Sequence, residues 1–128
     1  QRNLSDEGRA QARRLSDWFR QRQLRARSVR SSPWCRCVDT ATLAFGQAER
    51  WAALGSPRGV SESTGAEHLA LLRQALQRAR SQSGFEVWVT HMFVLSDLVG
   101  TPTASGEGLV LQADAAGHPA VVGRIVVA

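Results

Sequence analysis

The sequence predicts a single α/β domain, a three-layer sandwich with a mainly parallel sheet and helices on both faces. Helical stretches alternate with short β-rich runs, and polar residues directly follow two of these runs. A chain of 128 residues suits one domain, and it shows no linker, internal repeat or low-complexity tract. We therefore expect residues 1–128 to fold around one sheet.

The first part of the chain predicts helix, strand and helix. Ser5 can cap a helix over residues 6–23, in which small and apolar residues recur every three or four positions. Residues 27–31 predict a short strand that ends at Ser32-Pro33, because proline has no N–H to donate. Proline also opens helices, and the next helix is expected over residues 34–45.

The second part begins with a stretch, residues 47–65, that has no sustained period and predicts a long excursion over the active face. A leucine stripe then predicts a helix over residues 66–80. The remaining elements are expected to be a strand over 85–89, a helix over 92–99 and a final hairpin of strands over 108–113 and 120–127.

The charge pattern limits the classes of partner that we expect. All 16 basic residues are arginine, and residues 1–50 hold eleven of them against five acids. Because lysine and tyrosine are both absent, base composition of the gene explains this bias better than selection for a polyanion. We expect no nucleic-acid partner, although binding through the arginine-rich first half remains an alternative. No apolar run is long enough for a membrane span, and the compartment stays open, with the cytoplasm slightly favoured.

The two cysteines do not predict a disulfide or a metal site. Cys35 and Cys37 are separated by one residue, too close for an easy disulfide, and no second cysteine pair exists for zinc. A metal would require His68 or His118 to approach from a distance. We interpret the cysteines as small thiols beside a functional arginine, and no motif requires a metal or an organic cofactor.

Arg36 and His91 predict a phosphate site. Each lies just past a strand end, near the start of a helix, where free N–H groups attract anions. A guanidinium matches phosphate oxygens bidentately, and an imidazole can donate a hydrogen bond or move a proton. The alternatives are a structural histidine for His91 and a surface ion pair with Asp39 for Arg36.

Three motifs resemble the histidine phosphatase (phosphoglycerate-mutase-like) superfamily, in the family's order. Leu4 to Ala12 (LSDEGRAQA) is similar to its L-S/T-x-x-G-x-x-Q-A helix start, and Ser31 to Ala41 (SSPWCRCVDTA) to its S-S-P-x-x-R-x-x-x-T-A segment. Val87 to His91 (VWVTH) resembles the strand that carries the second histidine. Ser105-Gly106-Glu107 also resembles a bacterial branch, so the resemblance covers nearly the whole chain.

The resemblance implies a phosphatase that hydrolyses a small phosphorylated substrate through a phosphohistidine intermediate. It assigns Arg36 to a phosphate clamp and His91 to the second histidine. Glu107 and Glu62 are both candidates for the acid that protonates the leaving oxygen. The resemblance leaves the substrate and the oligomeric state open.

The chain departs from the family in one respect. The family begins with a central strand that ends in Arg-His-Gly, whose histidine is the nucleophile, and no Arg-His pair occurs here. Because this motif would precede Leu4, we expect a truncation, and we expect the chain as given to be inactive and poorly stable. A non-catalytic domain that binds a phosphorylated ligand through Arg36 and His91 remains the alternative function.

Overall fold

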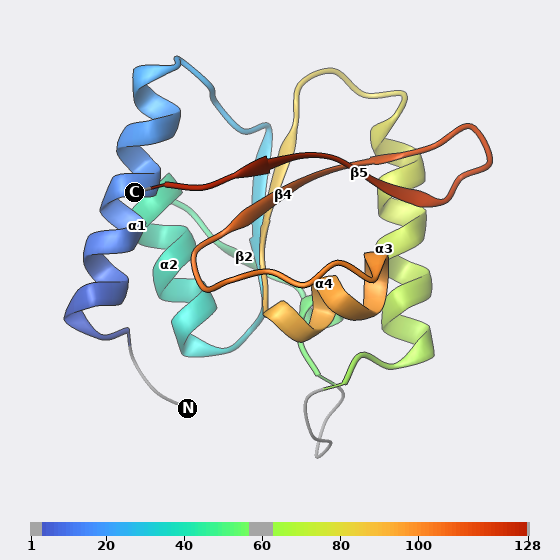
Figure 1. Ribbon diagram of the computed structural model, residues 1–128, viewed down its shortest axis with the longest axis horizontal. Helices are drawn as coiled ribbons and strands as arrows, with labels where there is room; N and C mark the ends of the chain where they lie inside the picture. The colour runs from blue at the N-terminus through green and yellow to red at the C-terminus, as the bar shows by residue number, and fades with distance from the viewer. Residues whose placement is uncertain (1–3, 57–62, 128) are drawn as a thin grey trace.

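The computed structural model describes residues 4–56 and 63–127. Figure 1 shows the helices over residues 6–21 and 35–45 on one side of the strands and those over residues 66–79 and 92–99 on the other, which confirms the predicted α/β class with a parallel sheet and helices. In chain order the elements are α1 (Asp6–Gln21), β1 (Ser28–Ser31), α2 (Cys35–Phe45), β2 (Glu49–Arg50), the 3-10 turn η1 (Ala52–Leu54), α3 (Ala66–Ala79), β3 (Glu86–Val89), α4 (Met92–Val99), β4 (Gly108–Ala113) and β5 (Pro119–Ile125).

The strands are divided between two sheets. The first has the order β2-β1-β3, and all its strands are parallel. The second is the antiparallel hairpin of β4 and β5, which confirms the predicted final hairpin and contains an irregularity between Val110 and Leu111. Figure 1 shows the hairpin passing in front of the parallel strands. Among the described residues, β3 pairs with β1 alone and is therefore an edge of its sheet.

Residues 47–65 were expected to form a long excursion over the active face, and within them the structure describes a short parallel strand, β2, and the turn η1. Glu49 and Arg50 pair in parallel with Arg30 and Ser31 of β1, and η1 follows directly. A strand of two residues is too short to show a period in the sequence, and only its pairing with β1 defines it.

Helix α1 forms as its sequence predicts. The hydroxyl of Ser5 accepts a hydrogen bond from the N–H of Gly8 at 3.1 Å, and Asp6 and Glu7 lie at the positive end of the helix dipole. Ala12 is buried on the inner face, and Phe19 packs against aromatic rings of neighbouring segments. The arginines of this helix are exposed: Arg9, Arg13, Arg14 and Arg20. In the part of the chain described, no helix is both long and apolar enough to cross a membrane.

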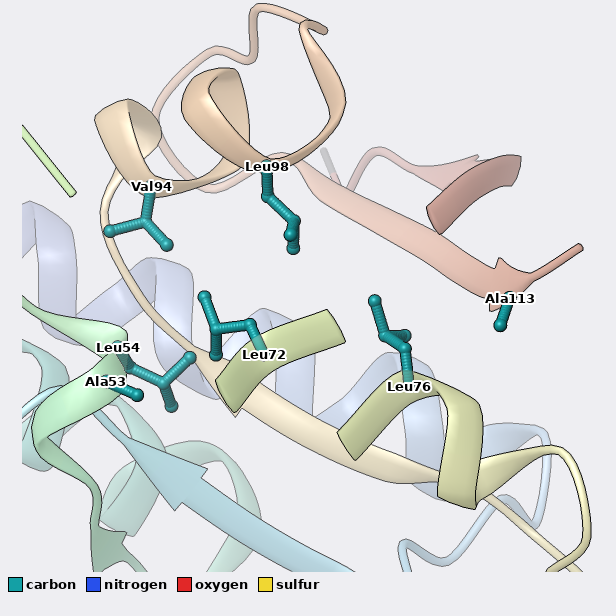
Figure 2. Packing of buried hydrophobic residues seen from close by; sticks show 7 residues of the cluster. All are labelled: Ala53, Leu54, Leu72, Leu76, Val94, Leu98 and Ala113. Atoms are coloured by element: carbon teal, nitrogen blue, oxygen red, sulfur yellow. The ribbon is translucent and has the colours of Figure 1, made fainter. Parts of the chain in front are cut away.

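The main core lies between α3, α4, η1 and the hairpin. Figure 2 shows Leu72 and Leu76 of α3 beside Val94 and Leu98 of α4, with Leu54 of η1 close by. The two α3 leucines belong to the stripe that predicted this helix. These side chains are buried between several elements of the fold. Their packing holds α4 in place, and with it His91, the residue that precedes α4.

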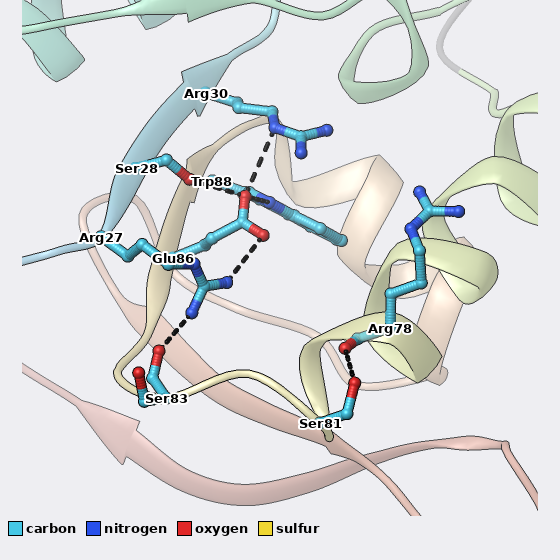
Figure 3. Close-up of polar contacts among 8 residues, drawn as sticks. All are labelled: Arg27, Ser28, Arg30, Arg78, Ser81, Ser83, Glu86 and Trp88. Carbon is cyan, nitrogen blue, oxygen red and sulfur yellow. Dashed lines mark hydrogen bonds and ion pairs between the residues drawn. The ribbon is translucent and has the colours of Figure 1, made fainter.

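A polar network joins β1 to β3. The carboxylate of Glu86, in β3, contacts Arg27 at 3.2 Å, Arg30 at 3.3 Å and the hydroxyl of Ser28 at 2.9 Å (Figure 3). Burial raises the pKa of Glu86, but the hydrogen bond from Ser28 and the charge of Arg30 outweigh it, so the pKa lies below its ordinary value. The network therefore ties together the two strands whose ends carry the candidate site.

Candidate functional site

The candidate site lies at the carboxyl ends of β1 and β3. These strand ends are adjacent because Ser31 pairs with Val89, and the N–H of Ser32 donates to the carbonyl oxygen of Val89 at 2.9 Å. Helix α2 begins three residues after Ser32, and α4 begins directly after His91. Two helix N-termini therefore start from neighbouring strand ends, an arrangement that favours an anion.

His91 is held by contacts on several sides. Its Nε2 lies 2.9 Å from the hydroxyl of Ser32, and the Sγ of Cys37 lies 3.8 Å from the same nitrogen. The ring stacks on Phe93 with centroids 5.1 Å apart and meets the edge of Trp34 at 4.6 Å. These contacts fix the ring plane of a half-buried histidine at the N-cap position of α4.

Arg36 is exposed in the first turn of α2. The alternative role, an ion pair with Asp39, is not formed in the described structure, where no carboxylate lies within 4.0 Å of the Arg36 guanidinium. Its charge acts on Cys37, the residue that touches His91. Arg36 thus lies at the same strand ends as His91, on the neighbouring helix.

Cys37 is a neutral thiol inside the site. Burial raises its pKa to about 11, although a hydrogen bond with Ser32 and the charge of Arg36 act in the opposite direction. A protonated, buried thiol is a poor nucleophile and a poor metal ligand. Among the residues that the structure describes, no group of three or more histidines, cysteines and carboxylates could hold a metal ion.

Glu107 has contacts that do not suit a proton donor. One carboxylate oxygen accepts from the N–H of Ala104 at 3.0 Å, and the other lies 2.7 Å from a guanidinium nitrogen of Arg124 in β5. The hydrogen bond from Ala104 and then the contact with Arg124 hold the pKa of Glu107 below its ordinary value. The group is therefore ionised at neutral pH. The other candidate acid, Glu62, lies outside the described residues.

The two remaining histidines contact residues outside β1 and β3. His118 is exposed in the hairpin turn, where its Nδ1 lies 3.9 Å from Asp114. His68 is half-buried rather than on the surface, and its Nδ1 lies 3.2 Å from the carbonyl oxygen of Gly55. Neither histidine contacts Cys35 or Cys37 in the described structure, so the metal alternative has no support from these contacts.

Two residues at the site were not singled out from the sequence. Ser32 is fully buried and contacts His91, and Gly55 packs so closely that a Cβ placed on it would lie 3.1 Å from the Ser32 hydroxyl oxygen. Ser32 belongs to the Ser-Ser-Pro segment, which is the signal that could have found it. Gly55 has no signal in the sequence, because its role depends on the turn η1 lying beside β1.

Comparisons with known proteins give one family match and one similar fold. The model of the histidine phosphatase superfamily (branch 1) matches residues 2–55, which include the helix start at Ser5 and the segment from Ser31 to Arg36. The solved structure of the protein histidine phosphatase SixA complexed with tungstate is similar with a TM-score of 0.69 and 19% sequence identity. The match covers 97% of this chain and 83% of that one, and it shows a shared fold.

A search of curated proteins finds no match. The family model ends before β3, so its match does not include His91. The fold that the chain shares with SixA extends over nearly the whole chain, β3 included. The family match over residues 2–55 and the fold shared with SixA together confirm that this chain resembles the histidine phosphatase superfamily, and they support a phosphatase-type function.

Proposed function

We propose that this chain binds the phosphoryl group of a small phosphorylated substrate at the carboxyl ends of β1 and β3, as part of a histidine-type phosphatase. The observation that carries the proposal is the arrangement of Arg36 and His91 at the N-termini of two helices that leave neighbouring strand ends. Backbone N–H groups, a guanidinium and an imidazole are the groups that hold phosphoryl oxygens in proteins.

Arg36 and His91 would act during phosphoryl transfer by stabilising charge. As the phosphoryl group leaves the substrate oxygen and bonds to a histidine nitrogen, negative charge is spread over its three remaining oxygens. Positive or hydrogen-bonding groups fixed around these oxygens lower the barrier, and water then attacks the phosphohistidine to release phosphate. Glu107 could protonate the leaving oxygen only after Arg124 releases it, since that contact favours its ionised form.

By the resemblance, the nucleophile of this route is the histidine of an Arg-His pair. The sequence contains no such pair. His68 contacts the carbonyl oxygen of Gly55, and His118 lies near Asp114 in the hairpin turn, so we assign the nucleophile to neither residue.

The exposure of Arg36 bears on the substrate class. Arg36 is exposed, so its guanidinium can reach a phosphoryl group that stays attached to a larger molecule. SixA is a protein histidine phosphatase, and its similar fold makes phosphorylated protein side chains a second substrate class beside small phosphoesters.

The proposal is tested by measuring the binding of inorganic phosphate and tungstate, two tetrahedral oxyanions, by isothermal titration calorimetry. Replacing Arg36 by alanine should weaken binding by roughly tenfold or more, because a charge-assisted hydrogen bond contributes about 1.5–3 kcal/mol. Arg78→Ala is the matched control, since Arg78 is exposed in the last turn of α3, far along the helix from the strand ends. Equal losses in both variants would show general charge attraction and would contradict the site.

The second candidate function is a non-catalytic domain that binds a phosphorylated ligand. It is favoured by the absence of an Arg-His pair from the sequence and by the place of His118, which lies in the hairpin turn beside Asp114. A chromogenic phosphoester, p-nitrophenyl phosphate, separates the two functions. Turnover that is lost in Arg36→Ala would favour the enzyme, whereas oxyanion binding without any turnover favours the binding domain for this chain.

A further inference from the structure

The hydroxyl of Ser32 lies at the centre of the site. Ser32 is 0% exposed, and its Oγ accepts a hydrogen bond from the N–H of Trp34 at 3.3 Å. The same oxygen lies 2.9 Å from Nε2 of His91, and the Sγ of Cys37 lies 3.8 Å from that nitrogen. Groups from two helix starts therefore meet beside this hydroxyl.

The surroundings leave this hydroxyl little freedom. A Cβ on Gly55 would lie 3.1 Å from its oxygen, so η1 closes the site on that side. Ser32 is followed by Pro33, whose ring restricts the backbone, and its own N–H is bonded to Val89 at 2.9 Å. The position of the hydroxyl is thus set by β1, β3 and η1 together.

The hydrogen bonds at Ser32 can be counted. A hydroxyl has one proton to donate and two lone pairs, and the N–H of Trp34 occupies one lone pair. One proton and one lone pair remain, and His91 can use either of them. In the first arrangement Ser32 donates to Nε2 of a neutral His91. In the second, Nε2–H of His91 donates to Ser32.

Either arrangement gives Nε2 a defined partner. The second suits a histidine protonated at both nitrogens, the form that binds an anion most strongly.

We propose that Ser32 is a positioning residue, whose hydroxyl fixes the ring orientation and the protonated nitrogen of His91 for contact with a phosphoryl group. The inference rests on the proposed function, since it gives Ser32 a purpose only if His91 binds phosphate. Ser32 acts through His91 and does not need to contact the ligand.

The neighbouring serine supplies a matched control. Ser31 is also 0% exposed, but its Oγ has no hydrogen-bond partner within the described structure. Ser31→Ala therefore removes the same atom from an adjacent buried position without changing the contacts of His91. Removing an unpartnered buried hydroxyl should leave stability unchanged or slightly raise it.

The experiment measures the ring nitrogens of His91 by long-range ¹H–¹⁵N NMR and the affinity for inorganic phosphate in the same samples. Ser32→Ala should shift the His91 nitrogen signals towards a mixture of tautomers and weaken phosphate binding by roughly three- to thirtyfold. Ser31→Ala should change neither. Unchanged His91 signals in folded Ser32→Ala would overturn the proposal.

The outcomes separate this inference from the proposed function. If Arg36→Ala abolishes phosphate binding but Ser32→Ala changes neither His91 nor affinity, only the role of Ser32 fails. If His91 responds to Ser32→Ala but the unmodified chain binds no phosphate, the proposed function fails. If Ser32→Ala does not fold, Gly55→Ala is the second variant. It keeps the hydroxyl of Ser32 but places a Cβ 3.1 Å from the hydroxyl oxygen. For the proposal to stand, Gly55→Ala must shift the NMR signals of the His91 nitrogens.

Discussion

Replacing Glu86 by glutamine tests how the two strands of the site are held together. Glu86 is 12% exposed, and its carboxylate contacts two arginines, Arg27 and Arg30, and the hydroxyl of Ser28. Glutamine keeps the shape and one acceptor oxygen but removes the negative charge. The variant then leaves two guanidinium groups side by side without their shared carboxylate.

The magnitude follows from these contacts. A hydrogen bond to a charged group contributes about 1.5–3 kcal/mol when it is shielded from water, and an exposed ion pair contributes about 0–1 kcal/mol. The arginine side chains are 31% and 26% exposed, so the contacts lie between these limits. We expect Glu86→Gln to lower the free energy of unfolding by about 1–3 kcal/mol at pH 7, measured by urea denaturation at low salt.

The same variant predicts a pH dependence. The pKa of Glu86 in the folded chain lies below its ordinary value of 4.5, and burial alone would have raised it. A carboxyl group of this kind contributes its full stability above its unfolded pKa and loses it as the pH falls through the folded pKa. The difference between the wild-type chain and Glu86→Gln should therefore be constant from pH 7 to about 5 and shrink below pH 4.5.

Glu49→Gln is the control, because Glu49 is an exposed strand residue of the same sheet. It should change the free energy of unfolding by less than about 0.5 kcal/mol. The reasoning would be refuted if Glu86→Gln behaved like this control, or if its effect were the same at pH 3 as at pH 7.

Two further predictions concern the core and the thiols. Leu72→Ala should destabilise the chain by about 2–5 kcal/mol in urea denaturation, because Leu72 is 0% exposed in the main core; a loss below about 1 kcal/mol would mean that the core does not close around it. Iodoacetamide at pH 8 should alkylate the exposed Cys35 and leave Cys37 unmodified until the chain unfolds, because burial raises the Cys37 pKa to about 11. The labelling is measured by mass spectrometry, and equal labelling of Cys35 and Cys37 would contradict this prediction.

The sequence by itself determined the order and nearly the bounds of the longer elements. The predicted helix over 92–99 matches α4, and the predicted strand over 27–31 contains β1. Caps, glycine and proline positions and apolar periods act within a few residues, so they can be recognised without the rest of the fold. For the same reason the sequence placed Arg36 and His91 just after strand ends, and it supplied the motifs of the family resemblance.

Only the tertiary structure decided which groups meet. Ser32 and His91 are 59 positions apart, as are Arg27 and Glu86, and no local pattern pairs such residues. The strand β2 exists because two residues lie beside β1. Glu107 accepts a local hydrogen bond from Ala104, and the tertiary structure adds the contact with Arg124 of β5. These contacts follow from the pairing of strands and the packing of helices, which bring distant residues within hydrogen-bond distance and so set their charge and orientation.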